Sequence, residues 1–184
     1  MRREPAKICS LVLALASLAF APHAARAQQL ASLRAPHETA KLGGASWLDF
    51  RSGAVGARGD LGFALLAIND EDWFSSHSTA EDRSVIKDLG ALAWADDYKI
   101  PALEPLPALA PGERRAITVD SSGGTGKAWA QTTRVFAKVV VGHLYVVHVK
   151  RDDADFYAAF RVESHEQRKA CTISWTNVPP PQPN

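Results

Sequence analysis

Two acidic clusters are the residues best suited to metal chemistry in this 184-residue sequence. Residues 69–72 read Asn-Asp-Glu-Asp, and residues 152–155 read Asp-Asp-Ala-Asp. Ca²⁺ takes about 6–8 oxygen ligands, and loop carboxylates commonly supply several of them. The candidate metal ligands are therefore Asp70, Asp72, Asp152, Asp153 and Asp155. Neither cluster has the spacing of an EF-hand loop, so solvated turn residues are the favoured interpretation of both.

Catalytic and cofactor motifs are incomplete throughout the chain. The glycine-rich residues 121–127 resemble a phosphate-binding loop, but Ser121 replaces its first glycine and Ala128 replaces the hydroxyl residue it requires. His143 and His148 lie five residues apart in one expected strand, so their side chains should point to opposite faces and not share a metal. No cofactor is predicted. A hydrolase-like enzyme with a dispersed active site and a haem- or metal-binding protein are the alternatives to a non-catalytic binding module.

Aromatic residues collect in the central segment, residues 69–126, which has the least strand-like pattern in the chain. Loops on a rigid β-scaffold commonly carry binding residues, and exposed aromatic rings mark ligand or partner surfaces. We therefore predict that a protein partner or a small ligand contacts this segment at Trp73, Phe74, Trp94 and Tyr98. Packing of these rings beneath the long loops is the structural alternative.

The first 27 residues have the three parts of a secretory signal peptide. A basic start that includes Lys7 precedes an apolar run over residues 8–20, and small residues stand at Ala25 and Ala27. The apolar run is shorter than the roughly 20 residues that cross a membrane, and no later segment is longer. We predict cleavage after Ala27, giving a secreted or periplasmic protein without a transmembrane segment.

The mature chain would have 157 residues, which suits one domain with its own hydrophobic core. It would retain 17 of the 21 basic residues and 19 of the 20 acidic residues. A mixed, nearly neutral surface argues against a nucleic-acid partner, which requires clustered Lys and Arg. Because Cys9 leaves with the signal peptide, no intramolecular disulfide is possible, and Cys171 is interpreted as a small buried apolar residue.

Alternating apolar and polar residues predict an antiparallel meander in the last third of the chain. Its strands are expected at residues 143–149, 156–163 and 171–177. In the second of these, Phe156, Ala158, Phe160 and Val162 should share one face. Further strands are expected at residues 47–50, 60–68, 116–120 and 133–141. The pattern predicts an all-β or β-dominated single domain, either an antiparallel sandwich or a partly open barrel, with at most one short helix.

The remaining segments should be irregular, apart from one short helix. A Ser-x-x-Glu capping box at residues 78–81 predicts a helix over residues 79–89. Four prolines make residues 100–111 an extended surface crossing. We expect residues 28–44 to be a flexible N-terminal arm, residues 45–177 to form the domain and residues 178–184 to be a proline-rich tail.

The meander resembles the closing module of uncharacterised exported bacterial β-proteins. The matching stretches are Val-Gly-His-Leu-Tyr-Val-Val-His-Val-Lys at 141–150, Asp-Phe-Tyr-Ala-Ala-Phe-Arg-Val at 155–162 and Cys-Thr-Ile-Ser-Trp at 171–175. Residues 47–53 and 59–64 are similar to the first hairpin of HmuY-like haem-binding surface proteins. These resemblances cover less than half of the chain and imply a β fold and export, but no haem ligand.

Overall fold

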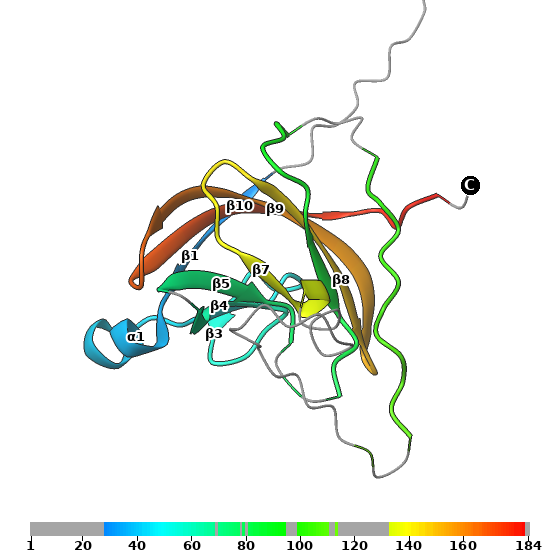
Figure 1. Cartoon of the computed structure of the whole chain (residues 1–184), viewed down its shortest axis with the longest axis horizontal. Coiled ribbons are helices and arrows are strands. Elements are labelled where there is room, and N and C mark those ends of the chain that lie inside the picture. Colours follow the sequence, from blue (N-terminus) through cyan, green and yellow to red (C-terminus); the bar gives the residue numbers. More distant parts are fainter. Residues whose placement is uncertain are drawn as a thin grey trace, which may run out of the picture.

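The structure is a computed structural model that describes residues 28–68, 70–77, 79, 81–94, 99–110, 113 and 133–182. It consists of two five-stranded antiparallel sheets that face each other (Figure 1). Sheet A has the strand order β1 (Gln29–Arg34), β10 (Ala170–Val178), β9 (Ala154–Glu166), β8 (Leu144–Arg151) and β6 (Val85–Asp88). Sheet B has the order β3 (Val55–Gly56), β2 (Trp47–Leu48), β4 (Leu61–Ile68), β5 (Glu71–Ser75) and β7 (Phe136–Lys138). The predicted β-sandwich class is confirmed, and the sheets do not close into a barrel.

Several sequence predictions lie outside the described residues. They are the signal peptide at residues 1–27, the strand at residues 116–120, the glycine-rich loop at residues 121–127 and the aromatic residue Tyr98. The described residues contain no helix long and apolar enough to cross a membrane.

The C-terminal meander forms as the alternation predicts. β8 pairs with β9 and β9 with β10, with Tyr145 opposite Phe160 and Phe160 opposite Trp175. Ala158, Phe160 and Val162 are fully buried in the core between the sheets, and Phe156 packs against its edge. Cys171 is also buried there, as expected. The alternation of apolar and polar residues predicted the buried faces correctly because one face of each strand meets sheet B.

Large aromatic rings fill the space between the sheets. Phe160 stacks on Tyr145 with ring centroids 4.8 Å apart and meets Phe74 edge-on at 4.9 Å. Phe50, from the turn after β2, packs against Trp175 at 5.3 Å. These rings come from both sheets, so their burial holds the two layers together.

The predicted flexible arm at residues 28–44 is wrong. Residues 29–34 are β1, which pairs along its whole length with β10, and Leu33 is fully buried in the core. A short helix, α1 (Pro36–Leu42), follows with proline at its start and Gly43 after its end. The segment has few aromatic residues, but Ala31, Leu33 and Ala35 alternate and supply an apolar edge to the core.

The predicted helix at residues 79–89 is also wrong. Val85 and Ile86 belong to β6, which pairs with His148 and Val147 of β8. The carboxylate of Asp82 accepts the Thr79 N–H at 3.1 Å, so this capping contact closes a turn and starts no helix. β-Branched residues fit a sheet edge better than a helix interior, and pairing with β8 outweighs the local capping signal. Residues 133–135 are helical, so the described residues contain two short helical stretches instead of at most one.

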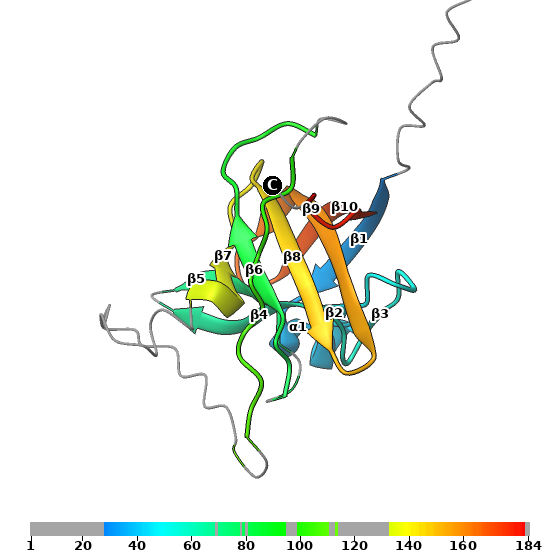
Figure 2. The same ribbon diagram turned by 90° about the vertical axis from the view of Figure 1, so that its right-hand side faces the viewer.

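The expected extended crossing is present and covers the outer face of sheet A. We call the described residues 99–110 the strap. They contain no regular helix or strand, and they run along β6 and β8 in both views (Figures 1 and 2). The Leu106 N–H donates to the Arg83 carbonyl oxygen at 2.9 Å, and the Arg83 side-chain Nε donates to the Leu106 carbonyl oxygen at 2.7 Å. Because the strap covers this face, sheet A is buried on both sides near its centre.

Candidate functional site

A pocket of about 280 Å³ lies where the strap, β6 and the start of residues 133–135 meet. We call it the strap pocket. Its lining consists of Val85, Ile86, Lys87, Ala102, Leu103, Glu104, Thr133 and Arg134. It lies beside β6, the edge strand of sheet A that is near β7 of sheet B. The pocket therefore lies at a side of the sandwich where no strand among the described residues continues either sheet.

The apolar part of the pocket belongs to a small hydrophobic cluster that is separate from the main core. Val85, Leu106 and Val135 are buried in this cluster, and Leu103 and Phe136 pack against it. Leu106 is fully buried, so it anchors the strap to the sheet. Val85 and Leu103 also line the pocket and give it an apolar floor that is fixed by packing.

Charged residues stand at the pocket's polar side. Lys87 and Glu104 are exposed, and Arg134 is half-buried. One guanidinium nitrogen of Arg134 donates to the main-chain carbonyl of Glu104, which ties the two walls together. Within the described part of the chain, the side chains of Lys87, Glu104 and Arg134 form no ion pair.

His148 and Tyr157 hold the strap in place next to the pocket. Their rings stack with centroids 4.2 Å apart and an interplanar angle of 15°. His148 Nδ1 lies 2.7 Å from the carbonyl oxygen of Leu103, and its Nε2 lies 2.9 Å from Oδ1 of Asp155. The Tyr157 hydroxyl accepts the Leu103 N–H at 3.2 Å and lies 3.2 Å from the Leu103 carbonyl. The backbone of Leu103 is thus fixed by two side chains of sheet A.

Both ring nitrogens of His148 contact oxygen atoms that can accept hydrogen bonds. Hydrogen bonds from Lys150 and His148 lower the pKa of Asp155, so this carboxylate is an acceptor at neutral pH. The Leu103 carbonyl is also an acceptor. Both ring nitrogens of His148 are therefore occupied by contacts with Asp155 and Leu103. His148 is therefore a structural clamp and does not offer a free nitrogen to a metal.

The five candidate metal ligands are dispersed and mostly occupied by basic partners. Buried Asp72 contacts His165 Nε2 at 2.8 Å and accepts the Arg168 N–H at 2.6 Å, and Asp70 pairs with the Arg168 side chain at 3.6 Å. Asp153 pairs with Arg51 and Arg151, and Asp155 pairs with His148 and Lys150. Asp152 is exposed. No group of three or more metal-ligating side chains converges anywhere in the described residues.

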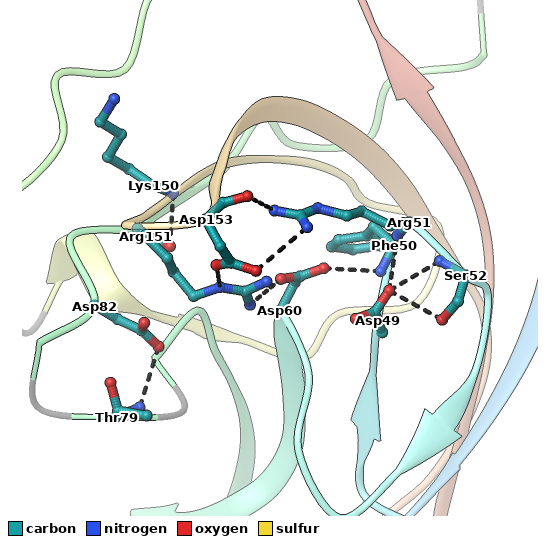
Figure 3. A network of polar contacts seen from close by, with 11 residues as sticks. Asp49, Phe50, Arg51, Ser52, Asp60, Thr79, Asp82, Lys150, Arg151 and Asp153 are labelled. Atoms are coloured by element: carbon teal, nitrogen blue, oxygen red, sulfur yellow. Dashed lines mark hydrogen bonds and ion pairs between the residues drawn. The ribbon is translucent and has the colours of Figure 1, made fainter.

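A second polar cluster surrounds the buried carboxylate of Asp60 (Figure 3). Asp60 is fully shielded from solvent, accepts the Phe50 N–H at 2.8 Å and forms an ion pair with Arg151. Burial raises the pKa of Asp60. Arg151 also contacts Asp153, which in turn pairs with Arg51 on the loop after β2. The cluster joins the ends of strands from both sheets, and its charges are satisfied internally, which indicates a structural role.

Of the four aromatic residues predicted to contact a ligand, the three that the structure describes are not brought together. Phe74 is fully buried in the core, so the prediction that it contacts a ligand is wrong. Trp73 and Trp94 are half-buried, and Trp94 Nε1 donates to the Ser174 hydroxyl at 2.9 Å on the outer face of sheet A. Tyr98 lies outside the described residues. Phe74 is inside because β5 alternates, with Asp72 and Phe74 facing the core and Trp73 facing out.

The residues that line the strap pocket were not singled out from the sequence. Lys87, Leu103 and Arg134 are separated by long stretches of chain and belong to no motif. The one local signal was the proline-rich crossing itself, since an extended segment packed over a sheet edge can form a wall of a pocket. Six of the eight lining residues fall within residues 69–126, the segment expected to contact a ligand, and contact of a ligand with this segment stays a prediction.

Comparison with known proteins provides no evidence on the functional site, so the choice of the strap pocket rests on its geometry. No family model, no curated protein and no solved structure matches the chain. The resemblances to exported β-proteins and to HmuY-like proteins therefore stay predictions.

Proposed function

We propose that this protein is an exported, non-catalytic binding module that takes a small ligand in the strap pocket. The observation that carries the proposal is a pocket with an apolar floor and unpaired charged side chains at one edge of the sandwich, within the described residues. Ligand sites in proteins commonly combine such an apolar floor with a few placed polar groups. The basic, apolar and small-residue pattern of residues 1–27 supports the proposal of export.

The composition of the lining supports binding over catalysis. Its polar side chains are Lys87, Glu104, Thr133 and Arg134, which can orient a ligand by charge and hydrogen bonds. A serine-type mechanism needs a nucleophile beside a positioned base. Ser174 is buried, donates to Glu163 and accepts from Trp94, so its hydroxyl is committed to structural contacts. The alternative of a dispersed active site has less support than a binding pocket.

A small-molecule panel tests the proposal directly. The ¹⁵N-labelled mature chain would be titrated with octanoate, octylamine, octan-1-ol and N-acetylglucosamine while amide shifts are recorded by NMR. We expect at least one compound to shift the amides of residues 85–87, 102–104 and 133–134 in a saturable way. Ala102→Trp, which fills the pocket, should abolish these shifts. Ala91→Trp, at an exposed position outside the lining, should leave them unchanged.

Two results would contradict the proposal. Absence of saturable shifts at these amides with every compound would remove the pocket as a binding site. Shifts that persist equally in Ala102→Trp would place binding elsewhere. Chemical conversion of a panel member by the protein would instead favour the enzyme alternative.

A further inference from the structure

We infer that the strap pocket selects small carboxylates that carry a short apolar chain. This inference rests on the proposed function and adds the chemical class of the ligand. It follows from three features of the pocket: its excess of positive charge, the orientation of Arg134 and the apolar floor.

The charge of the lining favours an anion. Lys87 and Arg134 contribute two positive charges, and Glu104 contributes one negative charge. None of the three is neutralised by an ion pair within the part of the chain that the structure describes. The single net positive charge matches a monoanion. A dianion such as a phosphate monoester would meet the Glu104 carboxylate with more repulsion than a carboxylate does.

Arg134 is held where it can bind a carboxylate with two hydrogen bonds. Its Nη2 donates to the Glu104 carbonyl, which ties the guanidinium to the strap. A guanidinium has five N–H donors in a rigid fork, so donors remain after this contact. Paired N–H donors match the two oxygens of a carboxylate, and an already ordered side chain loses less entropy on binding.

The floor of the pocket fits an apolar chain. Val85 and Leu103 line it, and both are fixed by the cluster that contains Leu106 and Val135. The volume of about 280 Å³ is just below the range of about 300–1,000 Å³ that is typical of drug-sized ligands, which indicates a small molecule. None of the lining residues is aromatic, so the lining offers no stacking platform for a sugar or a base.

Octanoate, octan-1-ol and octylamine separate the contributions of charge and apolar chain, because they share one chain and differ in head group. We expect octanoate to bind about tenfold more tightly than octan-1-ol, as a charge-assisted hydrogen bond implies, and octylamine to bind most weakly. Affinities would be measured by NMR titration at the amides of residues 85–87 and 102–104. Raising the salt concentration should weaken octanoate binding and leave octan-1-ol binding unchanged.

Charge variants at exposed positions give effects of opposite sign. Lys87→Met should weaken octanoate binding about tenfold with little effect on octan-1-ol. Glu104→Gln should strengthen octanoate binding about twofold to fivefold by removing repulsion. Lys99→Met is the matched control, since Lys99 is an exposed lysine of the strap outside the lining and should have no effect. Melting curves of the variants would show that each is folded.

The outcomes distinguish this inference from the function on which it rests. Equal or tighter binding of octan-1-ol or octylamine at the same amides would overturn the carboxylate preference and leave the binding function standing. Weaker octanoate binding in Glu104→Gln would also overturn it. Failure of all three compounds and of N-acetylglucosamine to shift these amides would overturn both.

Discussion

Removal of the Arg151 guanidinium should expose the cost of burying the Asp60 carboxylate. Asp60 is shielded completely and Arg151 is 19% exposed, so Arg151→Met leaves a buried charge without its partner. Breaking one side of a buried ion pair costs about 3–5 kcal/mol. Because Asp60 keeps the hydrogen bond from the Phe50 N–H, we expect a loss of about 2–4 kcal/mol in the free energy of unfolding at pH 7. The melting temperature should fall by about 5–15 °C.

The size of this loss should depend on pH in a defined direction. Burial raises the pKa of Asp60, so the folded protein holds this proton more tightly than the unfolded chain. The contribution of Asp60 to stability is therefore complete below the ordinary aspartate pKa and declines as pH rises through its folded-state pKa. Without Arg151 the carboxylate lacks its counter-charge, so the total decline in stability becomes larger. The destabilisation by Arg151→Met should be small near pH 4 and largest near pH 7.

Urea denaturation of the wild-type and variant chains at several pH values measures this effect. Arg51→Met is the matched control, because Arg51 and its partner Asp153 are 43% and 68% exposed and belong to the same cluster. Exposed pairs contribute about 0–1 kcal/mol, so this control should lose little stability at any pH. The double variant Asp60→Asn/Arg151→Met should recover part of the loss. The reasoning is refuted if Arg151→Met costs less than Arg51→Met, or if its cost is independent of pH.

Three further predictions concern the core and one close backbone approach. Phe160→Ala should lower the free energy of unfolding by about 3–5 kcal/mol in urea, because Phe160 is fully buried among aromatic rings, and a loss below about 1 kcal/mol would contradict that packing. Burial raises the pKa of the Cys171 thiol, so Ellman's reagent at pH 8 should modify it only after unfolding, and rapid modification of the native protein would disprove its burial. Gly59→Ala should destabilise by about 1–3 kcal/mol, since a Cβ there would lie 2.4 Å from the Leu48 carbonyl oxygen. Gly56→Ala, with its nearest such contact at 3.7 Å, is the control and should be nearly neutral in the same thermal melts.

Local patterning was sufficient to predict the strands of the meander and the extended strap. Phe160 and Ile173 lie on the faces expected from period 2, because each strand has one side against sheet B and that side must be apolar. The prolines of residues 100–111 exclude a regular helix or a central strand whatever surrounds them. These features depend on neighbouring residues alone, so they can be derived from the order of the side chains.

Long-range pairing determined the elements that local patterns misassigned. β1 has a weak strand pattern and forms because β10 offers it a partner. β6 replaces the expected helix because Val85 and Ile86 pair with the edge of β8. Helix and strand propensities differ by only about a few tenths of a kcal/mol per residue. Strand pairing and the burial of an apolar side chain easily outweigh such differences.

The candidate site depends on tertiary structure even more strongly. The strap pocket joins β6, the strap and Arg134, and the clamp on the strap joins His148 to a carbonyl 45 residues away. Asp60 and Arg151 are separated by 91 residues. No spacing along the chain encodes such contacts, because they arise only when two sheets and a crossing segment pack together. The sequence therefore supplies the strands and the crossing, while folding brings together the charges and the apolar floor that a ligand would contact.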